Sequence, residues 1–373
     1  MVYPYLPIFG RGLEVDLRML SLAITIRSAS GVLGPFLASV GDSRGRKTGM
    51  LLGAGLFTAS AAVMVIWPTY PTFVLSLVLG IMANFVFVPS VQAFLGDRIS
   101  YERRGLVLGL AELGWSLSFI LGMPAVGLII DRQGWRGPFP WLTGLGLAAM
   151  LLLWLILPDD RPSQSSGPVV LKNLRLILTT LPALAGILVA MAITASNELF
   201  NLTFGAWLEG TFAVKIATLA AASAIIGASE LSSEVMASGL VDRLGKRLAT
   251  VIGLMLNGLA VLALPYLGKS LTGALIGLFF IYFTFEFTVV SSIPLMTEVL
   301  PAARATFMST YIAAMAVGRS LGALVVPALY NPDTPQVSLM PVVLAAVFLN
   351  AVALLALRVV KTSSTSEGKS LAA

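Results

Sequence analysis

The sequence lacks cysteine and histidine altogether. Without cysteine, the chain of 373 residues forms no disulfide and supplies no thiolate for catalysis or metal binding. Without histidine, it lacks the side chain that titrates near neutral pH and the commonest metal ligand. It also contains no Walker loop of the form G-x-x-x-x-G-K-[ST], which argues against the use of ATP. We therefore expect a protein that is not an enzyme and that needs no cofactor and no metal.

Charged residues are also scarce. They make up 11% of the chain, whereas about 25% is usual in soluble domains. Hydrophobic residues make up 57%, so the composition indicates a membrane protein with many spans. The opening residues, MVYPYLPIFGRG, lack the basic start and the cleavage site of a signal peptide. Residues 1–10 would reach only about 15 Å as a helix, against roughly 30 Å of hydrocarbon, so we expect a truncated first span.

Apolar runs of bilayer length recur along the chain. Runs of twenty or more residues without alternation fit helices and not the strands of a membrane barrel. Gly318 and Gly322 form a G-x-x-x-G pair, a spacing that lets two helices approach closely. The sequence predicts twelve spans, the first incomplete, at about 1–11, 19–41, 48–67, 71–95, 105–130, 138–157, 180–207, 214–240, 249–268, 271–297, 305–329 and 337–358.

The loops between these spans differ in basic charge. One set holds sixteen of the 24 lysines and arginines, and the opposite set holds six. Because basic loops stay in the cytoplasm, we expect both chain ends to face inward from the plasma (inner) membrane. This asymmetry accounts for the net charge of +6 without a nucleic-acid partner.

Two similar halves flank one polar stretch. Residues 159–175 are rich in proline, serine and glycine and read as a cytoplasmic linker. We expect helix bundles at 1–158 and 179–360, a linker at 159–178 and a cytoplasmic tail at 361–373.

Asp42 and Gly45 match Asp242 and Gly245 at an offset of 200 residues. Asp97 and Arg103 match Glu298 and Arg304 at an offset of 201, which indicates an internal duplication.

The first of these strings carries a family resemblance. Residues 38–47, ASVGDSRGRK, are similar to G-x-L-A-D-R-x-G-R-K, the loop after the second helix of major facilitator superfamily transporters. The string departs from that pattern at Ala38 and Ser43, and the second copy has Ser238 at the first glycine. The resemblance is strongest to bacterial drug- and sugar-efflux branches. It implies an all-α fold of two six-helix bundles related by a pseudo-two-fold axis.

The resemblance also implies a gate on the cytoplasmic side. Asp42 would face the inner start of the eleventh span, near Arg304, and Asp242 that of the fifth, near Arg103. Both contacts would close that side and break on inward opening. The alternative is that these charges only fix topology. The expected gate residues are Asp42, Gly45, Arg46, Lys47, Asp242, Arg243, Gly245, Lys246 and Arg247.

Several polar residues fall inside predicted spans, where a charge costs roughly 2.5–3.5 kcal/mol. Glu286 and Arg319 lie just past the middle of consecutive spans, so we expect them to pair or to share a polar cavity. Glu230 and Glu234 are four residues apart and share one helix face. The alternative for each is a structural ion pair. The candidates for binding substrate or protons are Arg27, Glu112, Asn197, Glu198, Glu230, Glu286 and Arg319.

These features favour a secondary active transporter that is coupled to protons and exports small organic or amphipathic compounds. Gly122, Pro124 and Gly127 partly match the Gly-Pro element of the family's exporters, which favours export. Two alternatives stay open: a sensor or degenerate carrier that transports nothing, and a uniporter or symporter of a small metabolite. The expected partners are a small-molecule substrate, protons and the lipid bilayer, with the protein acting as a monomer.

Overall fold

The computed structural model describes residues 2–34, 36–37, 45–98, 114, 117–158, 169–300 and 303–360. Within these ranges every regular element is a helix, which confirms the predicted all-α fold class. Nine of the described helices are long and apolar enough to cross a membrane. The protein is therefore a multi-pass membrane protein.

The first half of the chain begins with two short helical segments and continues with longer helices. In chain order the elements are η1 (Tyr3–Tyr5), α1 (Leu6–Leu13), α2 (Leu17–Ser30), η2 (Gly31–Leu33), α4 (Arg46–Ile66), α5 (Tyr70–Arg98), η3 (Ser118–Gly122), α7 (Met123–Gln133) and α8 (Pro138–Ile156). Asp16 fixes the start of α2, because its side chain accepts a hydrogen bond of 2.9 Å from the Met19 amide.

The fifth predicted span, as far as it is described, contains an irregular turn. Its η3 segment is a five-residue π-helical turn that leads directly into α7. Pro124 lies in the first turn of α7 and has no amide hydrogen, so the regular hydrogen-bond ladder cannot run through it. The proline thus explains why the wider turn lies at this point.

The second half consists of six long helices and one shorter helix. They are α9 (Val169–Thr179), α10 (Leu181–Phe212), α11 (Ile216–Leu244), α12 (Lys246–Leu267), α13 (Leu271–Met296), α14 (Arg304–Leu329) and α15 (Pro335–Val359). Helix α9 occupies the last part of the stretch that we predicted as a linker. Its Ile177 is fully buried, and the helix packs against α10 and α14, which explains why this part is ordered as a helix.

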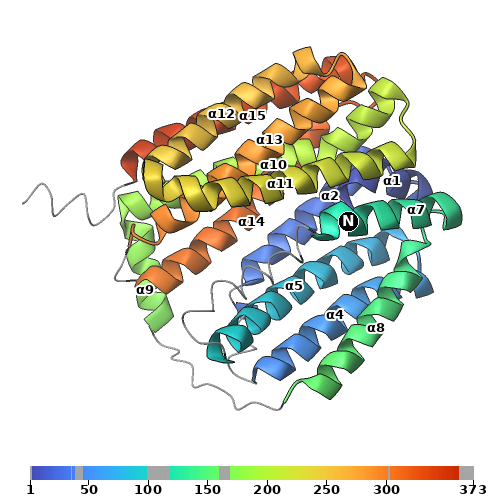
Figure 1. The fold of residues 1–373 in the computed structure, drawn as a ribbon, viewed down its shortest axis with the longest axis horizontal. Helices are drawn as coiled ribbons and strands as arrows, with labels where there is room; N and C mark the ends of the chain where they lie inside the picture. The colour runs from blue at the N-terminus through green and yellow to red at the C-terminus, as the bar shows by residue number, and fades with distance from the viewer. Residues whose placement is uncertain are drawn as a thin grey trace, which may run out of the picture.

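The two halves form adjacent groups of helices. Figure 1 shows α4, α5 and α8 together, with the helices of the second half above them. The halves contact each other mainly where α2 packs on α14 and where α7 packs on α11. Small residues allow this approach: a Cβ atom on Gly31 would lie 2.8 Å from the Ala316 Cβ, and one on Gly127 would lie 3.0 Å from the Ala220 Cβ.

A hydrophobic core joins the halves at the end of the molecule far from α9. Tyr5 and Phe9 from the first half are buried in the same cluster as Leu199 and Trp207 from α10. The Phe9 ring lies 5.6 Å from that of Phe73, measured between ring centroids. Because α10 starts beside α9 and ends at Phe212, this core marks the opposite end of the bundle.

Candidate functional site

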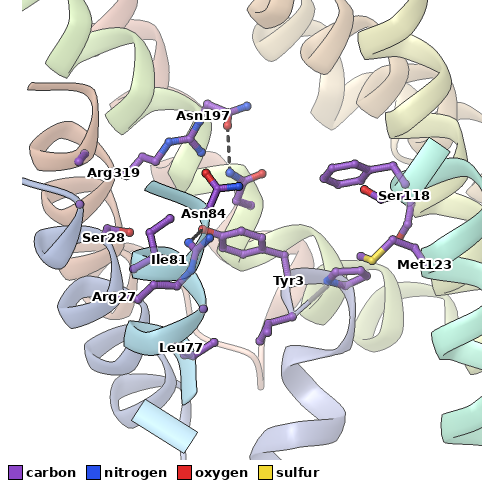
Figure 2. A pocket seen from close by; sticks show the side chains of 18 of the residues that line it. Tyr3, Arg27, Ser28, Leu77, Ile81, Asn84, Ser118, Met123, Asn197 and Arg319 are labelled. Carbon is purple, nitrogen blue, oxygen red and sulfur yellow. Dashed lines mark hydrogen bonds between the residues drawn. The ribbon is translucent and has the colours of Figure 1, made fainter. Parts of the chain in front are cut away.

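A cavity of about 540 Å³ lies between the two halves and is lined by both. The first half contributes Tyr3, Arg27 and Asn84 among others, and the second contributes Tyr282 and Arg319. Figure 2 shows Arg27, Asn84 and Arg319 on one side of this cavity and Ser118 and Met123 on the other, with Tyr3 between them. Much of the remaining lining is aromatic: Phe57, Phe73, Phe85, Phe119, Phe139, Phe204 and Phe285.

Helix α10 carries a polar row next to the cavity. Asn201 follows Asn197 by four residues and Glu198 by three, so its side chain meets both on one helix face. The Asn201 amide group donates to Asn197 Oδ1 over 2.9 Å and to Glu198 Oε2 over 3.0 Å. The Tyr282 hydroxyl donates to Asn201 Oδ1 over 2.7 Å, which ties α13 to the row.

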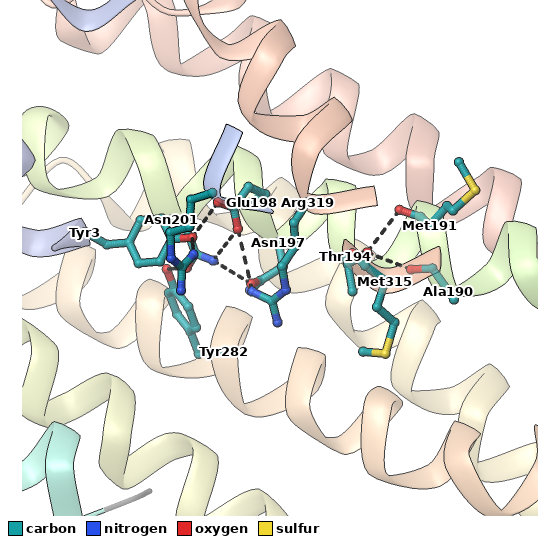
Figure 3. A network of polar contacts seen from close by, with 11 residues as sticks. Tyr3, Ala190, Met191, Thr194, Asn197, Glu198, Asn201, Tyr282, Met315 and Arg319 are labelled. Carbon is teal, nitrogen blue, oxygen red and sulfur yellow. Dashed lines mark hydrogen bonds and ion pairs between the residues drawn. The ribbon is translucent and has the colours of Figure 1, made fainter. Parts of the chain in front are cut away.

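The Glu198 carboxylate connects the two halves of the molecule. It has no exposed surface and lies behind the cavity lining. The Tyr3 hydroxyl donates to its Oε1 over 2.6 Å, and Arg319 Nη1 lies 3.6 Å from its Oε2 (Figure 3). A buried carboxylate is tolerated only with such partners, because taking an ion out of water is costly. Disturbing this charge would therefore affect contacts made by helices of both halves.

Arg27 extends this network from α2. Its Nη1 donates to the Tyr3 hydroxyl oxygen over 3.1 Å. Its guanidinium carbon also lies 5.7 Å from the centroid of the Tyr3 ring, a cation–π distance. The hydroxyl of Tyr3 thus accepts from one half and donates to the other.

The G-x-x-x-G pair positions Arg319. A Cβ atom on Gly322 would lie 2.6 Å from the Ala195 carbonyl oxygen, so α14 fits against α10 only because glycine is there. Gly318 is equally close to Met191 and Thr194. This contact brings α14 onto the helix that carries Glu198 and sets Arg319 beside that carboxylate.

The predicted candidates in the spans converge on the cavity. Arg27, Asn197, Glu230, Glu286 and Arg319 all line it, and Glu198 lies directly behind. Arg319 forms its ion pair with Glu198, whereas Glu286 shares the cavity with Arg319. Glu112 lies outside the described residues.

Four residues of this site were not among the predicted candidates. Asn201 follows Asn197 by one helical turn, so the spacing within α10 was a usable signal. Asn84 is a single amide in an otherwise apolar run, which was a weaker signal. The sequence offered no signal for Tyr3 and Tyr282, because tyrosines in membrane helices commonly pack against other helices or lie near the membrane surface.

The gate residues that the structure describes lie at the ends of α4, α11 and α12 and do not line the cavity. Gly45 and Gly245 precede α4 and α12 and have φ angles of +98° and +83°, a conformation that favours glycine. Arg46 and Lys47 begin α4. Asp42 lies outside the described residues, as does Arg103, the expected neighbour of Asp242.

The second copy of the gate string contacts its own half. Lys246 Nζ lies 2.5 Å from Glu298 Oε1, so α12 is linked to the end of α13. The Arg247 guanidinium donates to the carbonyl oxygens of Val360 over 2.8 Å and Leu357 over 3.0 Å. Asp242 and Arg243 are exposed near the end of α11 and form no hydrogen bond or ion pair with the described residues.

A different ion pair joins the two halves at the opposite end. Arg11 Nη1 of α1 lies 2.8 Å from Glu209 Oε1 of α10. Glu209 is near the end of α10, which is the end far from α9. The pair therefore lies at the same end as the aromatic core around Phe9.

Comparison with known proteins identifies the family. The family model described as Major Facilitator Superfamily matches residues 1–327. The uncharacterized MFS-type transporter YceJ of Bacillus subtilis (strain 168) is 25% identical over 334 residues, covering 89% of this chain and 85% of that one. The Quinolone resistance protein NorA of Staphylococcus aureus (strain MRSA252) is 24% identical over 210 residues, covering 54% and 53%.

Solved structures show the same fold at low sequence identity. A D-xylose-proton symporter superposes with a TM-score of 0.73 at 16% identity, covering 93% of this chain and 91% of that one. A peptide transporter POT gives a TM-score of 0.73 at 16% identity, covering 94% and 88%. Together with the family match and the helices on both sides of a central cavity, these findings show that the chain belongs to the Major Facilitator Superfamily of membrane transporters.

Proposed function

We propose that this protein is a proton-coupled secondary transporter that exports small organic or amphipathic compounds by alternating access. The observation that carries this proposal is the network around Glu198, which joins η1 and α2 of one half to α10 and α14 of the other beside the cavity. A titratable group in that position can link proton binding to the arrangement of the two halves.

The cavity supports a small organic substrate. Its volume of about 540 Å³ falls within the roughly 300–1,000 Å³ range of small-molecule sites. Its lining combines several phenylalanine rings with a few polar groups, the pattern expected for an amphipathic compound.

The proton step would use Glu198. As a carboxylate, Glu198 attracts Arg319 and accepts from Tyr3 and Asn201. Protonation removes its negative charge, which weakens the attraction to Arg319 and loosens the link between the halves. Glu230 and Glu286, which line the cavity, are further candidates for exchanging protons with the aqueous phase.

The alternation would use the two ends of the bundle in turn. In the described conformation, the Arg11–Glu209 pair and the Phe9 core hold the halves together at one end. We propose that this is the outer end, that the gate residues face the cytoplasm, and that both chain ends lie inside the plasma (inner) membrane. The excess of lysine and arginine in the opposite loops supports this orientation. We also propose that a monomer suffices, since one chain supplies both halves of the cavity.

Two observations support the proposed direction of transport. The quinolone resistance protein among the relatives and the partial Gly-Pro element at Gly122 and Pro124 favour export. A non-transporting carrier and a uniporter or symporter are the competing outcomes of the test.

Flux measurements in proteoliposomes test the proposal. The probes are three compounds built on one ring system: 1-naphthoate, 1-naphthamide and 1-naphthylmethylammonium. We expect movement of at least one probe, beyond its movement in liposomes without the protein, to follow an imposed pH gradient and to stop when an ionophore removes that gradient. Flux of all three that is indifferent to the gradient would contradict proton coupling, and no flux at all would favour a non-transporting protein.

A further inference from the structure

The positive charge of Arg27 has no carboxylate partner within the described part of the chain. Its contacts are the Tyr3 hydroxyl oxygen at 3.1 Å and the face of the Tyr3 ring. Arg319, by contrast, lies 3.6 Å from Glu198 Oε2. Arg27 lines the cavity inside a membrane span, where an isolated charge is costly. Its charge is therefore available to a negative group that enters the cavity.

Buried donors lie in the wall around Arg27. The Asn197 side-chain nitrogen has no hydrogen-bond partner among the described residues, although Asn197 is only 5% exposed. The Ser28 hydroxyl, in a residue that is 4% exposed, likewise has none within the same set. Both residues line the cavity, and buried polar groups normally have partners. Both groups are therefore donors without a partner in the wall of the cavity, among the described residues.

The picture of the cavity shows these groups together. In Figure 2, Arg27, Ser28, Asn84, Asn197 and Arg319 all lie on the side opposite Ser118 and Met123. They come from α2, α5, α10 and α14, so helices of both halves build this wall. We call these five residues the donor wall.

We propose that the donor wall is a subsite for the carboxylate of an amphipathic organic acid, so that the substrate class is organic anions with an apolar ring or chain. This inference deepens the proposed function and rests on it for the claim that the bound compound is transported. A guanidinium matches a carboxylate well, since its N–H groups form two parallel hydrogen bonds. Amide and hydroxyl groups can donate to the same carboxylate, whereas the like charges of the guanidinium groups disfavour an ammonium ion. The phenylalanine-rich remainder of the cavity takes the apolar part.

Equilibrium binding to the purified full-length protein in lipid nanodiscs tests the charge preference. The naphthalene probes have one ring system and differ in charge: 1-naphthoate is an anion, 1-naphthamide is neutral and 1-naphthylmethylammonium is a cation. We expect 1-naphthoate to bind at least about tenfold more tightly than the other two, because only it supplies a charged acceptor. Equal affinity for all three, or tighter binding of the cation, would overturn the inference.

Substitution of Arg27 tests where the carboxylate binds. Arg27→Met keeps an apolar stem and removes the charge, so we expect about a tenfold loss of 1-naphthoate binding and less than about a twofold change for 1-naphthamide. Arg18→Met is the matched control, because Arg18 lies exposed at the start of the same helix. It should leave both affinities unchanged. Equal losses for both probes in Arg27→Met would mean that Arg27 supports the cavity structurally, which contradicts the proposal.

A second variant covers the case in which Arg27→Met fails to fold. Asn84→Leu leaves both arginines in place and removes one donor amide from the wall. We expect it to weaken 1-naphthoate binding about threefold to tenfold and to spare 1-naphthamide. Unchanged binding of 1-naphthoate in this variant would remove Asn84 from the subsite and count against the proposed wall.

The flux assay separates failure of this inference from failure of the proposed function. Movement of the cationic or neutral probe along a pH gradient, without preference for 1-naphthoate in binding, overturns the anion subsite and leaves the transporter standing. Selective binding of 1-naphthoate through Arg27, without movement of any probe along the gradient, supports the subsite and overturns proton-coupled transport.

Discussion

The two ends of the bundle differ in what their polar contacts join. At the end far from α9, Arg11 pairs with Glu209 across the two halves. At the α9 end, Lys246 pairs with Glu298 and Arg247 binds the end of α15, all within the second half. Arg11–Glu209 thus connects the two halves at one end, whereas Lys246–Glu298 stabilises a single half at the other. In the alternating access that we propose, a pair of the first kind would hold one side closed.

The contrast also bears on the role of the gate string. In the second half, its basic residues hold the start of α12 against α13 and α15. Glycines with positive φ start both α4 and α12, so the turn is repeated at equivalent points of the two halves. The same turn therefore precedes an equivalent helix in each half. The contact across the halves that we predict for Asp42 and Asp242 would form in the conformation that is closed on the cytoplasmic side.

The largest effect on flux should come from crosslinking the two halves at the end far from α9. We replace Arg11 and Glu209 by cysteine and join the two thiols with a short bis-maleimide. Because the halves must separate there to open the face at that end, flux in proteoliposomes should fall at least about tenfold. Each single cysteine variant treated in the same way is the control. Full flux after complete crosslinking would show that this end does not open.

Removing the charge at the centre of the network should have the next largest effect. Glu198→Gln keeps the shape of the side chain and abolishes its exchange of protons. We expect the flux driven by a pH gradient to fall about tenfold, while binding of 1-naphthamide changes little. Flux is measured against gradient size, and a wild-type dependence on the gradient in this variant would exclude Glu198 as the proton site.

A smaller effect should follow from loss of the hydroxyl that bridges the halves. Tyr3→Phe leaves Glu198 Oε1 and Arg27 Nη1 without that shared partner. An unsatisfied buried group costs about 1–3 kcal/mol, so the temperature of thermal unfolding should drop. Tyr70→Phe removes a hydroxyl that donates to the Met19 carbonyl oxygen within the first half and serves as the comparison. Unfolding of Tyr3→Phe at the wild-type temperature would show that the bridge contributes little.

The smallest effect should come from the pair within the second half. Lys246 and Glu298 side chains are 36% and 35% exposed, and a pair with that exposure contributes about 0–1 kcal/mol. We expect Lys246→Gln to change flux by less than about twofold and to lower the thermal unfolding temperature slightly. A loss of flux as large as that of the crosslinked protein would mean that this pair works in the transport cycle.

Much of the architecture was predictable from the sequence, because membrane spans are specified by length and apolarity. The interior location of Arg27, Glu286 and Arg319 was also predictable, because charged residues within spans avoid lipid. The partner of Arg319 was harder to predict. It pairs with Glu198 because Gly318 and Gly322 bring α14 against α10. The face that α14 turns towards α10 depends on contacts between residues distant in sequence.

The linker shows a second limit of sequence reasoning. Proline, serine and glycine at 159–168 dominate the composition of the whole stretch and concealed the helix that starts at Val169. Burial of Ile177 against α10 and α14 orders this helix, and a single sequence does not reveal such docking.

The π-helical turn at Ser118–Gly122 has a consequence for the shape of the binding cavity. Such a turn holds one residue more than a regular α-helical turn, so it shifts the register of the helix on one side relative to the other. Ser118 and Phe119 lie in this turn and face the cavity, next to α11. Deleting or adding one residue there would change which side chains face a bound compound, while α7 would keep its packing against α11. A change of one residue in length at this turn is therefore expected to alter which compounds bind and to leave the remaining helices in place.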